Sequence, residues 1–291
     1  YYATLTGITQ NVEECLMSDM ARLMFANSER SESNVTKNAI KEKLKNGEPV
    51  IGTFVRMSSI SMEILGLTGW DFAIIDAEHG VHTMEDISNM IRAAKSVGLS
   101  PIVRVPGTNP VNAMRCLDAG AEGVQIPQLT SLDQVEEVAK ACRYHPLGNR
   151  GMCNYVAATG YSTTPFDEHM KTSNDEVLLA VHVENAWAAE NIDKILEIPG
   201  IDVVFCGPND MSESLGVPGQ MQHPKVVALL DKVSDACRKK GVATGIFVKT
   251  PDLIGHWLEQ GFTYLTCSTD VGMYADIAKA KADQMRAEIS K

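Results

Sequence analysis

Residues 71–105 read DFAIIDAEHGVHTMEDISNMIRAAKSVGLSPIVRV, and this stretch contains the repeating unit of the fold. It begins with the apolar run DFAIID, continues with a helical pattern over residues 84–98 that closes in glycine, and ends with a second apolar run, SPIVRV. Both runs are continuously apolar rather than alternating, which is typical of parallel strands covered on both faces. The stretch therefore predicts a strand, a helix and a second, parallel strand.

The same alternation of apolar runs and helical patterns recurs along the chain from residue 39 onward. The apolar, β-branched runs lie at residues 50–55, 71–76, 100–105, 122–127, 177–184, 201–206, 242–248 and 263–267. Eight such units over roughly 250 residues are typical of a closed (β/α)₈ TIM barrel, with a doubly wound open sheet as the competing arrangement. We predict an α/β protein whose barrel, the catalytic domain, spans residues 38–291.

Residues 1–37 differ from the rest of the chain. Apolar side chains recur at helical spacing between Val12 and Met24, and the polar stretch SESNVTKN that follows is typical of a linker. We expect an N-terminal helical extension and linker over residues 1–37, packed on the barrel or on another subunit.

Composition excludes several classes of protein. The formal charge of −11 and the lack of a basic cluster argue against nucleic-acid binding and favour a small-molecule or protein partner. No apolar run reaches the roughly 18 residues that a membrane span needs. The 7 cysteines are scattered and odd in number, which argues against a complete disulfide framework and indicates a reducing cytoplasm.

Polar residues follow most of the predicted strands, and in a parallel barrel the catalytic groups come from the carboxyl ends of the strands. Any one of these residues alone is more often part of a solvated turn, but the convergence of six such ends indicates a site. The residues are Asp76, Glu78 and His79 after the second strand, Arg104 in the third, Gln125 in the fourth, His182 and Glu184 in the fifth, Asp210 after the sixth, and Ser268 and Asp270 after the eighth.

Glu184 and Asp210 belong to adjacent strand ends. Two carboxylates at one height repel each other unless they bind a cation, share a proton or meet an arginine. Oxygen ligands without nearby cysteine select a hard divalent ion such as Mg²⁺ or Mn²⁺. The alternative is that Asp210 caps the helix that starts near MSESLG.

Arg104 follows three apolar residues in a strand that should be buried, so its guanidinium must be paired or face the cavity. It either pairs with Asp76 or meets a substrate carboxylate or oxyanion. His79 stands three residues after Asp76, close enough for the carboxylate to orient the imidazole for proton transfer. An isolated pattern of this kind is more often a loop histidine without a role.

Other catalytic patterns are missing from the sequence. It contains no nucleophile elbow, phosphate-binding loop or dinucleotide fingerprint. Lys249 lies one residue past the seventh strand, so its position leaves a Schiff-base lysine open.

Taken together, the segments GWDFAIIDAEHGVHTMED, PIVRVPGTNP, LDAGAEGVQIPQL, RYHPLGNRG, VHVEN and GPNDMSESLG resemble the HpcH/HpaI family of class II 2-oxo-acid aldolases. The resemblance covers about residues 39–288 in order. It implies a barrel of the phosphoenolpyruvate/pyruvate type in a homo-oligomer, often a hexamer. It also implies a metal-dependent carbon–carbon lyase that makes a pyruvate enolate from a 4-hydroxy-2-oxo acid or from oxaloacetate.

The resemblance assigns roles to the residues at the strand ends. Glu184 and Asp210 would bind the metal, Mg²⁺ or Mn²⁺ with Co²⁺ as a further candidate. His79 with Asp76 would transfer protons through water, and Arg104 would stabilise the enolate oxygen.

The resemblance also implies substrate-binding residues. Gly207, Pro208, Asn209 and Asp210 would bind pyruvate, with the backbone at Asn209 and Asp210 on its carboxylate, and Arg150 would lie near the mouth of the barrel. His182 stands where the family usually has glutamine, and it would hydrogen-bond the substrate or a metal-bound water. This departure puts the rate and the preferred substrate in question.

Three classes of function remain open at this point. The first is the lyase, whose enolate is either released as pyruvate or added to a further acceptor, as in the related macrophomate synthase. The second is a metal-dependent ester lyase or phosphotransfer enzyme on the same barrel, such as the citrate lyase β-subunit type, which the lack of a basic cluster for a coenzyme A or phosphate tail disfavours. The third is a non-catalytic barrel, which the polar strand ends disfavour.

Overall fold

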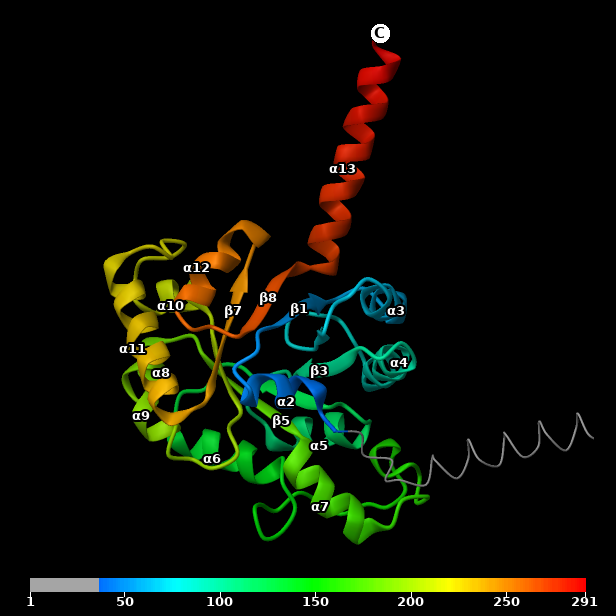
Figure 1. Cartoon of the computed structure of the whole chain (residues 1–291), viewed down its shortest axis with the longest axis vertical. Coiled ribbons are helices and arrows are strands. Elements are labelled where there is room, and N and C mark those ends of the chain that lie inside the picture. Colours follow the sequence, from blue (N-terminus) through cyan, green and yellow to red (C-terminus); the bar gives the residue numbers. More distant parts are fainter. Residues whose placement is uncertain (1–36) are drawn as a thin grey trace, which may run out of the picture.

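The computed structural model describes residues 37–291, which form a closed barrel of eight parallel strands surrounded by helices (Figure 1). The strands follow one another around the barrel in chain order, and β1 pairs with both β2 and β8. This closure confirms the predicted TIM barrel and excludes the open sheet. The predicted helix and linker of the N-terminal extension lie outside the described residues, apart from residue 37.

The elements have the following bounds. The strands are β1 Val50–Val55, β2 Phe72–Asp76, β3 Ser100–Arg104, β4 Gly123–Ile126, β5 Leu178–Val183, β6 Val203–Cys206, β7 Ala243–Val248 and β8 Tyr264–Thr269. The helices are α2 Ala39–Lys45, α3 Ser59–Leu67, α4 Met84–Ser96, α5 Pro110–Asp118, α6 Leu132–Ala141, α7 Phe166–Glu176, α8 Ala186–Glu190, α9 Ile192–Ile195, α10 Pro208–Ser214, α11 Pro224–Lys240, α12 Ile254–Glu259 and α13 Asp270–Ile289, with short 3₁₀ turns at Ala157–Thr159 and Pro251–Leu253.

The apolar runs of the sequence form strands that are buried on both faces. All five residues of β2 are buried, for example, because one face meets the barrel interior and the other meets the helices. The interior is a packed core and not a pore: Phe54, Phe72, Phe205 and Tyr264 fill it. Ile40 of α2 belongs to the same interior cluster, so α2 closes the amino-terminal end of the barrel.

Strand register brings the polar strand ends to one level. Asp76 of β2 is paired with Arg104 of β3, and Arg104 is paired with Gln125 of β4. On the other side of the fifth strand, His182 is paired with Phe205 of β6. Residues that are far apart in the chain therefore meet at the carboxyl-terminal end of the barrel.

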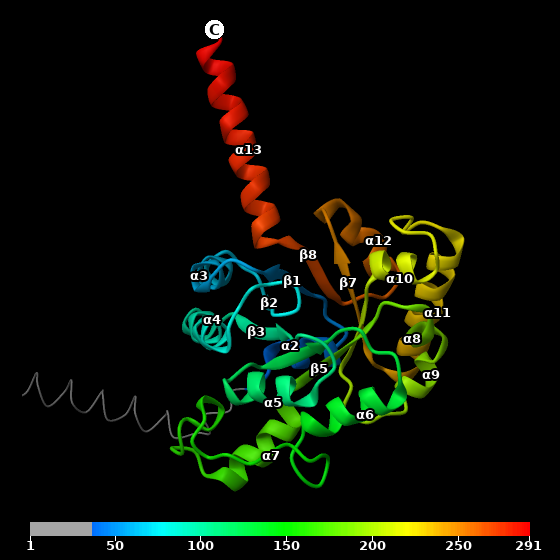
Figure 2. The ribbon, with the colours of Figure 1, turned by 180° about the vertical axis from the view of Figure 1, so that it is seen from behind.

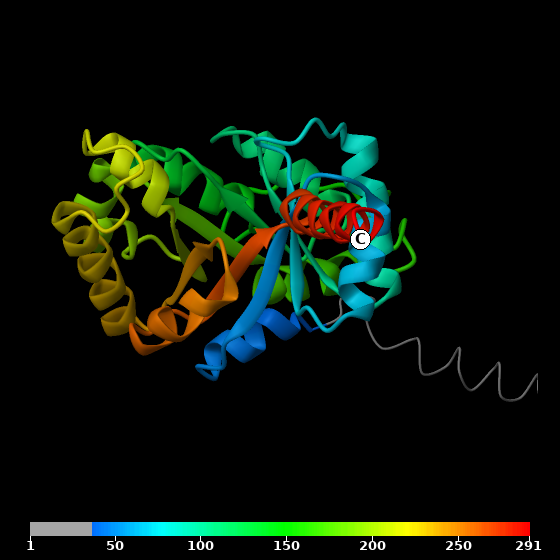
Figure 3. The same ribbon diagram turned by 90° about the horizontal axis from the view of Figure 1, so that it is seen from above.

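The last helix, α13, starts directly after β8 and runs away from the barrel (Figures 1 and 2). Seen from above, it is foreshortened and points outward (Figure 3). Only its first residue, Asp270, is buried. Within residues 37–291, no helix has the length and apolar character needed to span a membrane.

Candidate active site

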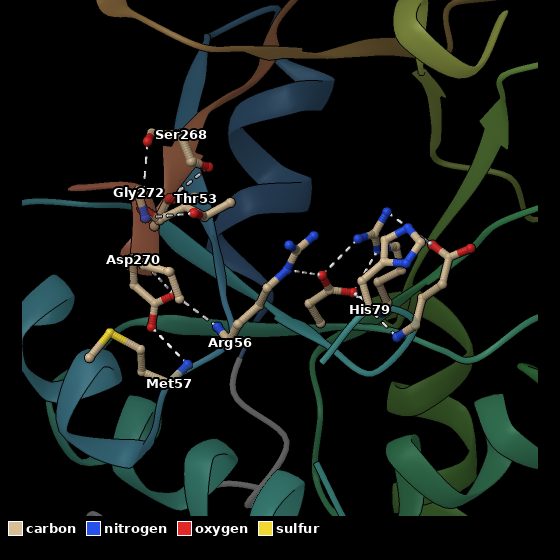
Figure 4. A network of polar contacts seen from close by, with 12 residues as sticks. Thr53, Arg56, Met57, His79, Ser268, Asp270 and Gly272 are labelled. Atoms are coloured by element: carbon tan, nitrogen blue, oxygen red, sulfur yellow. Dashed lines mark hydrogen bonds and ion pairs between the residues drawn. The ribbon is translucent and has the colours of Figure 1, made fainter. Parts of the chain in front are cut away.

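Asp76 lies at the centre of the strand ends and is completely buried. Its carboxylate accepts hydrogen bonds from Nε and Nη2 of Arg104 at 2.9 and 2.7 Å, and from Nε of Arg56 at 2.6 Å (Figure 4). Burial alone would raise the pKa of Asp76, but these two arginines outweigh it and lower the pKa to about 2. Asp76 is therefore a carboxylate anchor for two guanidinium groups.

Arg104 pairs with Asp76, as one predicted alternative had it, and also borders the cavity. Its Nε and Nη2 bind Asp76, its Nη1 lies 3.0 Å from Oε2 of Glu78, and the side chain borders a cavity. The guanidinium carbon also lies 4.7 Å from the centre of the Phe54 ring. These contacts fix the guanidinium in the plane of its partners, so it enters the cavity already oriented.

The predicted pairing of the Asp76 carboxylate with the His79 ring is not what the structure shows. Asp76 accepts a hydrogen bond from the backbone N–H of His79 at 3.2 Å, and its remaining partners include the two arginines. The His79 side chain is 58% exposed, and its Nε2 lies 3.8 Å from Oε2 of Glu78. The arginines outcompete the imidazole because they bring a permanent charge and a fork that matches a carboxylate.

Glu184 is held by hydrogen bonds on both carboxylate oxygens. Oε1 accepts the backbone N–H of Gln128 at 2.6 Å, and Oε2 lies 2.9 Å from Nδ1 of His182. Burial would raise the pKa of Glu184, but the charge and hydrogen bond of His182, the Gln128 amide and Arg104 together lower it to about 2. Glu184 is therefore a carboxylate at neutral pH.

His182 continues a buried chain of polar side chains. Its Nε2 lies 2.9 Å from Oε1 of Gln125, whose Nε2 donates to the hydroxyl of Tyr264 at 3.0 Å, and its ring stacks on Phe205 at 4.9 Å. Both ring nitrogens thus have protein partners. This arrangement favours His182 as a residue that positions Glu184 over the expected direct hydrogen bond to substrate.

Asp210 lies beside Glu184 at the start of α10. A β-carbon placed on Gly207 would lie 3.3 Å from Oε2 of Glu184 and 3.4 Å from Oδ2 of Asp210, so both carboxylates border this glycine. The same β-carbon would lie only 2.8 Å from Cβ of Glu184, so the site requires glycine here. Burial and the charges of Glu184 and Glu78 raise the pKa of Asp210. The capping alternative is wrong: α10 begins at Pro208, its N-cap is Gly207, and Asp210 stands in its first turn.

The two carboxylates fit a hard divalent cation whose remaining ligands are water and substrate. Among residues 37–291, no three Asp, Glu, His or Cys side chains form a cluster able to hold a metal ion. Two carboxylates, Glu184 and Asp210, remain, and Mg²⁺ in particular binds through one or two carboxylates with water or substrate completing its shell. Mutual repulsion between them, seen in the raised pKa of Asp210, is what such a cation would relieve.

A cavity of about 630 Å³ brings most of the predicted residues together. His79, Arg104, His182, Glu184 and the segment 207–210 all line it, whereas Asp76 lies behind them. Apolar side chains also line it, namely Met221, Phe247, Val248, Leu253 and Trp257. Lys249 also borders it, at an exposed position.

The resemblance implied that Arg150 lies near the mouth of the barrel, and this expectation is wrong. It is buried at the opposite end, where Nη2 binds Asp118 at 2.7 Å and Nη1 binds Ser173 at 3.2 Å. Asp118 ends α5 and Ser173 lies in α7, and both helices lead into the amino ends of strands.

Arg56 is the main residue that sequence reasoning missed. It lines the cavity and shares Asp76 with Arg104. The signal was present, because Arg56 directly follows the apolar run VIGTFV, as the other charged residues follow theirs.

Comparison with known proteins agrees with this geometry. Residues 51–276 match the family HpcH/HpaI aldolase/citrate lyase. The chain is 31% identical over 253 residues to 4-hydroxy-2-oxo-heptane-1,7-dioate aldolase of Escherichia coli, covering 86% of this chain and 96% of that protein.

Solved structures show the same barrel. The HpcH/HpaI aldolase of Desulfitobacterium hafniense superposes with a TM-score of 0.80 at 32% identity, covering 84% of this chain and 96% of that one. Macrophomate synthase superposes with a TM-score of 0.78 at 26% identity, covering 91% and 98% of the two chains.

Proposed function

The chain belongs to the HpcH/HpaI aldolase/citrate lyase family of lyases, and we propose that it forms the enolate of pyruvate with the help of a divalent cation. The sources of the enolate are retro-aldol cleavage of a 4-hydroxy-2-oxo acid and decarboxylation of oxaloacetate. One observation carries the proposal: Glu184 and Asp210 border Gly207 in the same cavity as the guanidinium of Arg104.

Mg²⁺ or Mn²⁺, or Co²⁺ in their place, would be held by Glu184 and Asp210 and would polarise the keto group of the substrate. Arg104 supplies a second positive charge for the enolate oxygen, and its contacts with Asp76 and Glu78 fix its orientation before the substrate arrives. Preorganisation of this kind lowers the barrier because little has to rearrange as charge develops.

The segment formed by Gly207, Pro208, Asn209 and Asp210 lines the cavity next to Glu184. We propose that the backbone amides of Asn209 and Asp210 hold the pyruvate carboxylate, beside the keto group that faces Arg104. The position of Asn209 and Asp210 in the lining of this cavity, in the first turn of α10, supports this placement.

We propose that His79 moves the proton through a water molecule. Its side chain borders the cavity and is more than half exposed, which leaves the imidazole free to exchange protons with solvent. Glu78, 3.8 Å from Nε2, is its side-chain neighbour. Decarboxylation creates the enolate without a base, so it depends less on His79 than aldol cleavage does.

Exchange of the methyl protons of pyruvate in D₂O tests the proposal, because it reports enolate formation without any second substrate. We expect exchange in the presence of Mg²⁺ or Mn²⁺ and none in excess chelator. Glu184→Gln should lose both Mn²⁺ binding and exchange, whereas Glu136→Gln, an exposed control on α6, should keep both. Full exchange in chelator or in Glu184→Gln would contradict the assignment.

We also propose a homo-oligomer, with six copies as the expected number. Exposed apolar side chains on two helices support it: Ile60, Ile64 and Leu67 repeat along α3, and Tyr274 and Ile277 lie on the projecting α13. A second copy of the chain would remove this apolar surface from water. Light scattering coupled to size-exclusion chromatography measures the number of copies, and a monomer would contradict this proposal.

We propose the cytoplasm as the location of the protein. The six cysteines at positions 37–291 are all free, and five of them are buried. Free thiols in this number fit a reducing compartment.

A further inference from the structure

Arg56 is fixed in place by two buried carboxylates. Its backbone N–H donates to Oδ1 of Asp270 at 2.9 Å, and the N–H of Met57 donates to Oδ2 at 3.0 Å (Figure 4). Its side chain donates from Nε to Asp76 at 2.6 Å. Both the backbone and the inner edge of the guanidinium are thus held in one geometry.

The outer edge of this guanidinium is free. Nε and Nη2 of Arg104 donate to Asp76 and its Nη1 forms an ion pair with Glu78, whereas Nη1 and Nη2 of Arg56 have no protein partner within the part of the chain that the structure describes. In Figure 4, no dashed line leaves these two nitrogens of Arg56. The side chain is 36% exposed and borders the cavity of the active site.

A planar guanidinium whose two terminal nitrogens are unpaired can bind a carboxylate. Two parallel N–H donors match the two oxygens of a carboxylate, and the charge makes these hydrogen bonds about twice as strong as neutral ones. An ordinary surface arginine loses side-chain entropy when it binds an anion, but Arg56 is already held by Asp76 and Asp270.

The position of Arg56 relative to Arg104 shows what kind of ligand reaches it. Phe54 lies in β1 and Arg56 directly follows this strand, and both side chains line the cavity. Arg104 lies over the Phe54 ring, and the centres of the Phe54 and Phe247 rings are 5.9 Å apart. An apolar surface therefore lies beside the two guanidinium groups, and it suits a short aliphatic chain.

We propose that Arg56 is a second anion-binding residue, which selects acceptor aldehydes that carry their own carboxylate. The proposal rests on the proposed function, since it concerns the partner of the pyruvate enolate. In the addition, the methyl carbon of the enolate bonds to the aldehyde carbon, the aldehyde oxygen gains a proton, and the carboxylate on Arg56 stays unchanged. In the reverse direction, a dicarboxylic 4-hydroxy-2-oxo acid is cleaved.

The test compares two aldehydes of equal chain length, 4-oxobutanoate and butanal, as acceptors for pyruvate. A charge-assisted hydrogen bond contributes about 1.5–3 kcal/mol, so kcat/KM should favour the acid by roughly 10- to 100-fold. Arg56→Met should bring this ratio close to one, and Arg56→Lys should leave an intermediate ratio because it keeps the charge and loses the fork. Lys249→Met, which removes another cation at the same cavity, should change the ratio by less than about twofold.

Three results would contradict the proposal. Equal kcat/KM for the two aldehydes in the wild type overturns it, and so does a preference that disappears in Lys249→Met. An equal loss with both aldehydes in Arg56→Met shows that Arg56 serves enolate formation. Should Arg56→Met not fold, the ratios of the wild type and of Arg56→Lys still decide. A wild type without pyruvate methyl exchange contradicts the proposed function instead.

Discussion

Both ends of the barrel bury charged side chains, and they differ in how these charges are balanced. At the amino-terminal end, Asp202 lies between Lys41, at 2.9 Å, and Arg143, at 3.2 Å. The two cations also donate to the backbone carbonyl of Val177, and Asp202 accepts the N–H of Leu179. Every member of this cluster is occupied by protein groups.

At the carboxyl-terminal end, the balance is incomplete. Glu184 and Asp210 border the same glycine, and Arg56 has a free outer edge. Buried charges that are fully paired stabilise a fold or specify it, whereas groups left with unused bonding capacity in a cavity are available to a ligand. The comparison therefore separates structural charges from functional ones.

The largest expected effect lies at the structural end. Asp202→Ala leaves Lys41 and Arg143 buried without their anion, so the free energy of unfolding should fall by about 3–5 kcal/mol. Urea denaturation followed by circular dichroism measures it. Asp283→Ala, which breaks the exposed pair with Lys279, is the control and should change stability by less than about 0.5 kcal/mol. Similar effects in the two variants would refute the description of Asp202 as structural.

The next effect concerns Asp76, which has both structural and functional partners. Its pKa is about 2 in the folded protein and 3.8 in a free side chain, so the folded form binds its proton less tightly. This contribution to stability is present above pH 4 and disappears as the pH falls through 2, and it amounts to about 2 kcal/mol. Urea denaturation between pH 5 and pH 2.5 should show a steeper loss of stability in the wild type than in Asp76→Asn. Equal slopes would mean that Asp76 is not the anionic anchor of the two arginines.

The smallest effect concerns His182, which connects Glu184 to the barrel interior. His182→Phe removes one of the two hydrogen bonds of Glu184, and Mn²⁺ affinity should fall roughly tenfold, since losing such a supporting contact costs 10- to 100-fold and the Gln128 amide remains. His182→Gln restores a donor and should recover part of the affinity. Isothermal titration calorimetry with Mn²⁺ measures both. Unchanged affinity in His182→Phe would show that His182 does not position Glu184.

The strands could be predicted because their signal is local. Runs such as DFAIID and SPIVRV are apolar on both faces, and only a covered parallel strand needs that pattern. The start of the helix after the sixth strand was harder to predict: the sequence indicated a start near MSESLG, whereas the helix begins at Pro208, and proline suits the first position of a helix. That uncertainty is why the sequence left open whether Asp210 is a cap.

The composition of the site was also predictable, apart from Arg56. Glu184, Asp210 and Arg104 were found because each follows an apolar run, and the same rule would have found Arg56. Gln125 was noted, but its link to His182 and Tyr264 depends on three strands meeting in the interior. Contacts of this kind leave no trace in the local sequence.

The sequence by itself determined which residues stand at the mouth of the barrel, because the order of apolar and polar segments decides where each strand ends. Only the tertiary structure decided which of these residues bind one another. Asp76 is three positions from His79 in the chain, yet its carboxylate binds Arg56 and Arg104, which come from neighbouring strands. The physical reason is that hydrogen bonds depend on the distance and direction between side chains in space, and strand register sets both of these across the sheet.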